Sequence, residues 1–590
     1  MKRRLISILV LPTLLVSACG SAPKAPSTER LVEEGYSTAI EYLEAYIPAR
    51  MKKHDFTGMS VALVDDQRVV WSEGFGFADE SVGKRATAST VYRAGSVSKL
   101  FTAMAAMKLA ENGVVDLDAP ITDHVPEFDL KTRFGSIDGI TLRTLLSHRA
   151  GVPSAIQDGL WAQEPDSFTT VATRLNRYYA AYPPDTVFAY FNAGYSVAGH
   201  GIENASGVPF TEYVETALLR PLDMDRSNFR FDATGEDVAR SYRKGREVEQ
   251  LGLRDLPAGG LVTTAGDLAN LVKLVNADGA YGSRLFAPET MQEMLSVRTT
   301  GSVHDVDGYN GIGWFTFTGF LDGKYATVGH NGQTLAHSAS VFIVPELRLG
   351  VVLLANSPSL AGGLEDITDE ILRVAHAVKT GRSLDAVPAI DKPATPLPGS
   401  EIGFDGLYAS GFGPLDISET EDGYDVRVEG TTMKLTGSAE GGHAVSALLL
   451  GFIPVTPPGM GDLSFFAREA SDEKMIFVVG PGGRVELIAT GIDAQARRPA
   501  WDAALGDYEL VNPAASDSPF VQVDGVTLAY AQGLYQLTVK TPLETRQLTL
   551  EVVDDAEAIL QGYGRGLGET VFLEPDGSLL HAEWRFERTS

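Results

Sequence analysis

The sequence predicts an α+β protein in which helices flank an antiparallel sheet and a helical subdomain lies between its strands, followed by an all-β region. Three observations support this prediction. Up to about residue 380, the chain shows a helical pattern, strands, a long helical stretch, further strands and a last helix. Beyond a proline-rich segment, short runs of alternating apolar and polar residues indicate strands alone. A chain of 590 residues also exceeds what one hydrophobic core usually serves, so we expect at least two domains.

The first domain, at residues 31–382, is predicted to begin with a helix and a hairpin. Apolar residues recur at near-helical spacing to about residue 49, and two short apolar strands follow at 60–64 and 68–71. The helix that starts at Ser96 is apolar on nearly every face, so we expect it to be buried under the sheet.

The rest of this domain is predicted to supply a long connection and then more sheet. Residues 154–187 are polar and aromatic, and such a connection either walls a pocket or is an ordinary surface loop. From their apolar patterns, the later strands are expected at residues 312–317, 325–330, 337–344 and 348–355, and the closing helix at 364–378.

A proline-rich segment at residues 383–400 is predicted to be a stiff linker between this domain and the all-β region. The β region carries a faint repeat, because Gly406-Leu407-Tyr408 returns as Gly506-Asp507-Tyr508. We therefore expect two barrel-like domains, at residues 401–495 and 496–590, with one larger barrel as the alternative.

The N-terminus is typical of an exported protein. Basic residues at positions 2–4 precede an apolar run at 5–16, and the only cysteine, Cys19, follows small residues. This junction resembles the lipobox of bacterial lipoproteins, in which the cysteine thiol is acylated. We expect a signal peptide at residues 1–19, a tether at 20–30 and a lipid anchor on a bacterial membrane, most simply facing the periplasm. The alternative is an accidental cysteine in an ordinary signal peptide.

The composition excludes one class of partner and leaves others open. A net charge of −28 and a pI near 4.8 argue against nucleic-acid binding, because no basic surface is large enough to neutralise phosphates. No segment after the leader is apolar enough to span a bilayer. The expected partners are a small-molecule or peptide substrate and, through the lipid anchor, a membrane. The oligomeric state stays open.

Ser96 and Lys99 form the first motif with chemical meaning. Residues at i and i+3 share a helix face, so the Lys99 amine can lie beside the Ser96 hydroxyl. The free N–H groups of the first helical turn then point toward a bound group. The Ser-x-x-Lys pattern alone is weak, because it also begins at Ser21, Ser81, Ser241 and Ser471.

Two further motifs follow in an order that chance rarely produces. The only Tyr-x-Asn pattern of the chain joins Tyr190 to Asn192, and the run Gly329-His330-Asn331-Gly332 lies on an expected strand. The candidate catalytic residues are therefore Ser96, Lys99, Tyr190, Asn192 and His330.

This set resembles the serine hydrolases of the class C β-lactamase and penicillin-binding-protein superfamily, which includes D-alanyl-D-alanine peptidases, D-aminopeptidases and related esterases. The resemblance covers about residues 31–380, and residues 140–151 and 257–268 also look like scaffold motifs of that family. It implies a β-lactamase/transpeptidase-like sheet with flanking helices, without a metal or a cofactor. Lipocalin-like barrels follow this domain in some relatives. One hypothesis is therefore that the β region covers the site.

The resemblance also implies roles for the residues. Ser96 attacks a carbonyl to form an acyl-enzyme, and Lys99 and Tyr190 share the proton, with the Lys99 ammonium placed to favour the Tyr190 phenolate. Asn192 holds Lys99 and the substrate amide, and the N–H groups of Ser96 and Gln333 form the oxyanion hole. The implied oxyanion and substrate-binding residues are Ser96, Asn331, Gly332 and Gln333.

Two other motifs of the chain could be mistaken for parts of the site. Lys379-Thr380-Gly381 spells a Lys-Thr-Gly motif, but it lies where the last helix is expected to end, so Lys379 fits a last-turn cation and Gly381 a helix cap. His148 is a tempting base, yet no partner carboxylate accompanies it, and a packed structural histidine is the preferred interpretation.

The expected function is hydrolysis of peptides, amides or esters through an acyl-enzyme, with D-amino-acid-containing substrates among them. Because His330 replaces a permanently charged lysine across the cleft, efficient β-lactam hydrolysis is less favoured. The alternatives are a class C-type β-lactamase and a non-catalytic penicillin-binding or sensor protein.

Overall fold

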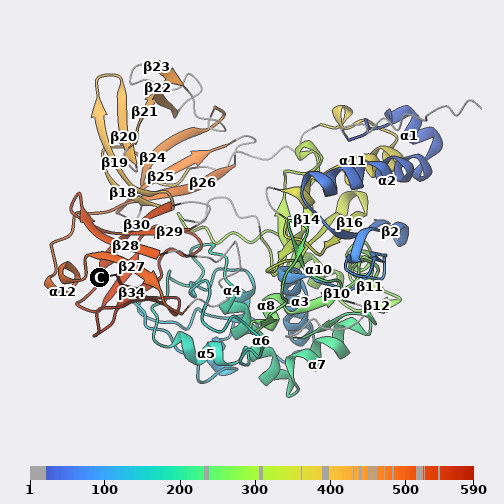
Figure 1. Ribbon diagram of the computed structural model, residues 1–590, viewed down its shortest axis with the longest axis horizontal. Helices are drawn as coiled ribbons and strands as arrows, with labels where there is room; N and C mark the ends of the chain where they lie inside the picture. The colour runs from blue at the N-terminus through green and yellow to red at the C-terminus, as the bar shows by residue number, and fades with distance from the viewer. Residues whose placement is uncertain are drawn as a thin grey trace, which may run out of the picture.

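The computed structural model shows an α+β domain followed by two β-barrels, which confirms the expected fold class (Figure 1). The expected signal peptide, Cys19 and residues 389–396 of the expected linker lie outside the described residues. No helix of the described chain is long and apolar enough to cross a membrane. The described residues are 22–230, 238–304, 310–359, 362–388, 397–428, 431–437, 442–449, 453–455, 461–470, 472–480, 484–512, 523, 525–541 and 545–589.

A seven-stranded antiparallel sheet with the order β13-β14-β15-β16-β1-β2-β3 forms the centre of the first domain. Its N-terminal hairpin joins the later strands because β1 pairs with β16, with Val61 opposite Leu353. The strands are β1 (Gly58–Asp65), β2 (Arg68–Asp79), β3 (Lys84–Arg85), β13 (Phe315–Phe317), β14 (Thr327–Gln333), β15 (Ser338–Val344) and β16 (Leu349–Ala355).

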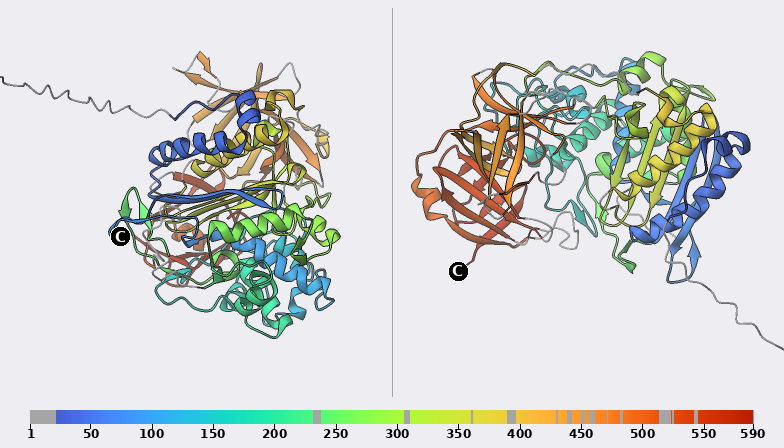
Figure 2. Two further views of the ribbon diagram at one scale, coloured as in Figure 1. Left: turned by 90° about the vertical axis from the view of Figure 1, so that its right-hand side faces the viewer. Right: turned by 90° about the horizontal axis from the view of Figure 1, so that it is seen from above.

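Helices cover both faces of this sheet (Figure 2). Along β16, Val351 and Leu353 pack in the core with α2 and α11, whereas Val352 and Leu354 pack in the core with α3 and α9. The alternation of side chains along a strand therefore builds two cores from one buried strand. The helices are α1 (Thr28–Glu34), α2 (Tyr36–Lys53) and α11 (Gly363–Thr380) on one face, and α3 (Ser98–Glu111) and α9 (Ala265–Asn276) on the other.

Short helices and strands between β4 and β13 form the helical subdomain that lies beside α3. The helices are α4 (Leu142–Leu146), α5 (Thr170–Leu175), α6 (Ala193–Ser206), α7 (Phe210–Val214), α8 (Leu256–Gly259) and α10 (Pro288–Leu295). The strands are β4 (Tyr92–Arg93), β5 (Trp161–Ala162), β6 (Asn228–Phe229), β7 (Tyr242–Arg243), β8 (Arg246–Glu247), β9 (Gly252–Leu253), β10 (Leu261–Thr263), β11 (Ala280–Tyr281) and β12 (Ser283–Arg284).

Two expected elements differ from the observed ones, and glycine explains both. The strand expected at 312–317 begins only at Phe315, because Gly313 has a φ of +81° and its Cα lies so close to α3 that a Cβ would meet Ala103 at 2.3 Å. The expected first helix is two helices, because Gly35, with a φ of 68°, ends α1. Helix α1 also begins at Thr28, within the expected tether.

The all-β region forms two barrels, so the alternative of one larger barrel is wrong. In the first, the ring β24-β25-β26-β18-β19-β20-β21-β22 closes where His443 pairs with Phe465, and β17 and β23 extend it. Its strands are β17 (Ser400–Glu401), β18 (Gly406–Ser410), β19 (Gly413–Thr420), β20 (Gly423–Val428), β21 (Thr431–Gly437), β22 (His443–Leu449), β23 (Ile453–Val455), β24 (Ser464–Ala470), β25 (Glu473–Val479) and β26 (Val485–Gly491).

The second barrel follows α12 (Pro499–Ala503) and closes on itself in the order β27 to β34. The repeated Gly-x-Tyr motif opens β18 and β27, and both Tyr408 and Tyr508 are buried in their barrel cores. Its strands are β27 (Gly506–Leu510), β28 (Gly525–Ala531), β29 (Leu534–Lys540), β30 (Thr545–Val552), β31 (Glu557–Leu560), β32 (Thr570–Leu573), β33 (Leu579–His581) and β34 (Trp584–Arg588).

The second barrel packs directly on the helical subdomain (Figures 1 and 2). Phe572 of β32 belongs to the same apolar core as α3, and its ring lies 5.3 Å from the ring of Tyr178. An ion pair between Arg177 and Glu574 at 2.8 Å lies at the same contact. The barrel is therefore part of the wall next to the candidate site.

Candidate active site

Ser96 lies in a 3₁₀ turn, η1 (Gly95–Val97), that leads into α3. The turn is tight because Gly95 has a φ of 53°, a conformation that L side chains rarely adopt. The apolar sequence of α3 buries the helix, and the turn presents Ser96 to the pocket at the N-terminal end of that helix.

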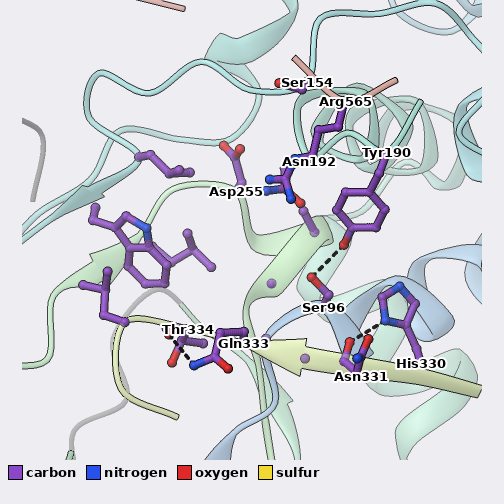
Figure 3. A pocket seen from close by; sticks show the side chains of 18 of the residues that line it. Ser96, Ser154, Tyr190, Asn192, Asp255, His330, Asn331, Gln333, Thr334 and Arg565 are labelled. Atoms are coloured by element: carbon purple, nitrogen blue, oxygen red, sulfur yellow. Dashed lines mark hydrogen bonds between the residues drawn. The ribbon is translucent and has the colours of Figure 1, made fainter. Parts of the chain in front are cut away.

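The structure places Ser96, Tyr190, Asn192 and His330 together at the pocket (Figure 3), and the Lys99 amine reaches Ser96 from α3. The Tyr190 hydroxyl donates to Ser96 Oγ at 2.8 Å, and Lys99 Nζ lies 3.2 Å from the same oxygen. Lys99 Nζ also donates to Asn192 Oδ1 at 2.8 Å and to the carbonyl of Ala258 at 2.9 Å. Asn192 thus holds Lys99 against the serine.

Burial sets the protonation of the two groups that can accept the serine proton. Lys99 is 0% exposed, and burial, with the charge of Arg565, lowers the pKa of its amine well below the ordinary range, although Asp255 opposes this shift. Burial raises the pKa of Tyr190, although the hydrogen bond to Ser96 and the charge of Arg565 oppose that change. The lowered pKa of Lys99 and the raised pKa of Tyr190 both favour a neutral amine beside a neutral phenol. The sequence had led us to expect an ammonium and a phenolate.

Strand β14 passes so close to the serine turn that only glycine fits at two positions. A Cβ on Gly332 would lie 1.9 Å from the carbonyl oxygen of Ala94 and 3.1 Å from the amide nitrogen of Ser96. A Cβ on Gly95 would lie 2.7 Å from the amide nitrogen of Gln333. The amides of Ser96 and Gln333 therefore lie close together at the pocket, which is the arrangement an oxyanion hole requires.

His330 is buried on β14 and is neutral near pH 7. Burial, followed by the charge of Lys99, lowers its pKa to about 3. Its Nδ1 donates to the carbonyl of Asn331, and its Nε2 has no hydrogen-bond partner among the described residues. The ring centroid lies 6.2 Å from that of Tyr190. His330 thus presents an uncharged ring to the pocket.

The side chains of the two residues that flank Gly332 are held by the protein itself. Asn331 Nδ2 donates to Glu365 at 2.9 Å, and Gln333 Nε2 donates to the carbonyl of Thr334 at 3.1 Å. Both residues line the pocket, and their part in substrate binding stays a prediction.

The two alternatives from the sequence take structural positions. His148 is buried, its Nδ1 accepts from the amide of Phe191 at 3.1 Å, and its ring packs 4.3 Å from that of Tyr190. Burial lowers the pKa of His148 well below its usual value. Lys379 lies in the last turn of α11, where it pairs with Asp65, and Gly381 caps the helix.

The pocket in front of Ser96 has a volume of about 820 Å³ and two walls from distant parts of the chain. The pocket lining includes Ser154 and Trp161, so the connection at residues 154–187 is a pocket wall. The second barrel supplies the second wall, in line with the hypothesis that the β region covers the site, but the sequence prediction named none of its residues. A glycine-rich run at residues 562–568 between two strands was the available signal. The barrel residues in the lining are Arg565, Gly566, Glu569, His581, Ala582 and Trp584.

A protein-family model described as Beta-lactamase matches residues 43–376, which is more than half of the chain. The chain belongs to the β-lactamase family. The matched residues contain every member of the serine-centred cluster, and members of this family are serine hydrolases. The two barrels lie beyond the matched residues.

Curated relatives of this β-lactamase-family chain cover its first domain. Protein flp of Staphylococcus aureus (strain COL) is 27% identical over 331 residues, which is 54% of this chain and 63% of the relative. Unguisins hydrolase ungD of Aspergillus violaceofuscus is 26% identical over 337 residues, which is 52% of this chain and 59% of the relative. The chain therefore spans less than two thirds of the length of these relatives.

Among solved structures, that of SurE is similar to this chain with a TM-score of 0.53 and 24% identity. The similarity covers 77% of this chain and 99% of SurE. A second structure, of SurE with D-Leu, is similar with a TM-score of 0.51 and 23% identity, and covers 76% of this chain and 98% of that chain. At this identity the likeness shows a shared fold.

Replacing Gly332 with alanine tests the close approach of β14. The new Cβ overlaps the carbonyl of Ala94, so the strand has to move away from η1 and the two amides separate. We expect the rate at which a fluorophosphonate labels Ser96 to fall about 100-fold, because small displacements of reacting groups cost that much.

The matched control is Gly266→Ala in α9, where the added Cβ comes no closer than 3.8 Å to another residue's side chain. It should label at the wild-type rate. Equal rates for Gly332→Ala and Gly266→Ala would contradict the close approach.

The neutral state of His330 predicts acid sensitivity of the fold. Its pKa is about 3 in the folded chain and about 6.5 when unfolded. Between these values the unfolded chain binds a proton that the folded chain does not, so the free energy of unfolding falls as the pH falls from 6.5 toward 3. From pH 7.5 to 4.5, we expect wild type to lose about 2.7 kcal/mol more than His330→Asn in urea unfolding. Equal losses would contradict the buried neutral histidine.

Proposed function

We propose that this protein is a serine acyl hydrolase that acts on peptides, amides or esters, D-amino-acid-containing peptides among them. The observation that carries the proposal is the Ser96 hydroxyl, which lies 2.8 Å from the Tyr190 hydroxyl and 3.2 Å from Lys99 Nζ. A nucleophile within hydrogen-bond reach of a buried proton acceptor is the arrangement that covalent acyl transfer requires.

The chemistry divides into two steps. In acylation, Ser96 Oγ attacks the substrate carbonyl carbon while its proton passes to the Lys99 amine, directly or through the Tyr190 hydroxyl. The carbonyl oxygen becomes an oxyanion that the amides of Ser96 and Gln333 stabilise. The intermediate collapses when the carbon–leaving-group bond breaks and the leaving group takes the proton. In deacylation, water gives a proton to the same pair and attacks the ester carbonyl. The bond between the acyl carbon and Ser96 Oγ then breaks, Oγ takes the proton back from the pair, and the acid product leaves.

The pocket supports a substrate larger than a simple ester. Its volume of about 820 Å³ lies in the range typical of ligand sites, and its lining includes the apolar side chains of Trp161, Leu253 and Leu335. His330 is neutral, so β14 supplies no permanent cation for a substrate carboxylate. The relative named unguisins hydrolase supports a hydrolytic activity for the shared domain, over 59% of that relative.

The second candidate is a β-lactamase of the class C type, which the description of the matched family favours. The acylation step would be the same for a β-lactam, and the two candidates differ in how fast the acyl-enzyme is hydrolysed. A non-catalytic penicillin-binding or sensor role is disfavoured, because such a protein would not need Lys99, Tyr190 and Asn192 hydrogen-bonded around Ser96.

We also propose that the protein is exported and lipid-anchored through Cys19 to a bacterial membrane, with the enzyme on the periplasmic side. The basic residues, the apolar run and the lone cysteine of the first residues support this proposal.

Labelling with a fluorophosphonate and with a fluorescent penicillin tests the nucleophile. We expect the fluorophosphonate to label wild type and not Ser96→Ala, because the probe reacts with an activated serine hydroxyl. Ser89→Ala, which removes an exposed hydroxyl in the same domain, should label as wild type does.

A panel of D-aminoacyl amides, aryl esters and a chromogenic cephalosporin then separates the candidates. Faster turnover of an ester or amide than of the cephalosporin supports the proposed function, and comparable rates would favour the β-lactamase. If wild type labels with neither probe and turns over no member of the panel, the proposed function is wrong.

A further inference from the structure

The loop between β31 and β32 carries one permanent cation into the pocket. Arg565 lies in this loop, and its guanidinium carbon lies 5.1 Å from the centre of the Tyr190 ring (Figure 3). Lys99 Nζ lies 4.9 Å from the centre of the same ring. The loop belongs to the second barrel, beyond the residues that match the β-lactamase family.

The shape of this loop is specified by glycines on both sides of the arginine. Gly564 has a φ of 117° and Gly566 a φ of 79°, conformations that favour glycine. The loop can therefore turn sharply on each side of Arg565 and project its side chain between the barrel and the first domain.

The first domain clamps the N-terminal side of the loop. The Tyr182 hydroxyl donates to the carbonyl of Gly562 at 3.2 Å and accepts from the amide of Gly564 at 3.0 Å. The rings of Tyr182 and Tyr563 stack with centroids 5.2 Å apart. The Tyr563 hydroxyl also lies 3.4 Å from Glu473 of the first barrel, so all three domains meet here.

The C-terminal side of the loop is held at the pocket wall. Glu569 Oε1 accepts from the amide of Ser154 at 2.8 Å, and the carbonyl of Ser154 accepts from the amide of Asn192 at 2.7 Å. The loop is thus connected by two hydrogen bonds to the residue that binds Lys99. Arg565 is presented from a backbone that is held at both ends.

Among the described residues, the charged groups around Lys99 and Tyr190 include no counterion for Arg565. Asp255 is paired with Arg254 at 2.8 Å, Glu569 binds Ser154, and His330 is neutral. Among the described residues, no carboxylate lies within ion-pair distance of the Arg565 guanidinium. The titratable and charged groups around the pair are Arg254 and Asp255 before α8, His148 and Arg149 after α4, His330 on β14, and Arg565 and Glu569 from the second barrel.

We propose that Arg565 is a positioning residue for acylation: its guanidinium holds the Tyr190 ring toward Ser96, and its charge disfavours an extra proton on the Lys99–Tyr190 pair. The inference rests on the proposed serine hydrolase function. A nearby cation favours loss of a proton from the pair whichever of the two groups loses it, so the effect does not depend on which group is the acceptor. The second barrel then contributes Arg565 to the environment of the Lys99–Tyr190 pair, which belongs to the first domain.

The test is the pH dependence of fluorophosphonate labelling, with its second-order rate constant measured for wild type, Arg565→Gln and Arg565→Lys. The probe carries no carboxylate, so its rate does not report substrate binding by the arginine. We expect the acidic limb of the profile to move about one pH unit higher in Arg565→Gln, because the pair gains a proton more easily without the cation. In Arg565→Lys, the retained charge should keep the limb close to that of wild type.

The matched control is Arg133→Gln, which removes a cation at the same domain contact, where Arg133 lies 3.6 Å from Glu551, outside the pocket lining. Its limb should match wild type, and thermal unfolding checks that each variant is folded. If the acidic limb of the pH profile lies at the same pH in Arg565→Gln as in wild type, the inference is wrong, even if the labelling rate falls equally at all pH values. If wild type is not labelled at any pH, the proposed function itself fails, and the inference with it.

Discussion

The burial of the Lys99 amine beside Ser96 is the constraint on which the rest of the site depends. An amine that is 0% exposed has to satisfy its hydrogen bonds within the protein, and Asn192 and the carbonyl of Ala258 do so. Those partners come from the start of α6 and from α8, so the helical subdomain has to pack on α3 for the lysine to be tolerated. The same burial lowers the pKa of the amine, so the buried lysine can also accept a proton.

The site also depends on parts of the chain that lie far apart in sequence. Strand β14 brings the amide of Gln333 to Ser96, and it can do so only because Gly95 and Gly332 have no side chains. The second barrel closes the opposite wall with Arg565 and Glu569. Both barrels contact the first domain, through Glu473 and His304 in one case and through Phe572 and Tyr178 in the other. The second barrel and the first domain therefore form the walls of one pocket.

Much of the first domain was predictable from sequence, because its motifs are short and its elements strongly apolar. Ser96 and Lys99 share one helical turn, and Tyr190 and Asn192 lie two residues apart, so local spacing indicates each pair. The order of the motifs and the resemblance to the family joined the pairs into one set. The predicted start of the strand at residue 312 was wrong, because the apolar pattern does not reveal that Gly313 lies against α3. The role of Arg565 was not predictable, because it depends on how a barrel more than 100 residues beyond the first domain packs, and no local pattern encodes that contact. The protonation of Lys99 likewise follows from burial rather than from the motif.

The proposed function requires a covalent intermediate on Ser96. The most direct test is rapid-quench mass spectrometry with an aryl ester, followed by peptide mapping of the quenched protein. We expect an acyl mass increase on the peptide that contains Ser96, which appears within one turnover and disappears when the ester is consumed. Turnover without any adduct on that peptide, or an adduct on a different residue, would show that Ser96 is not the nucleophile.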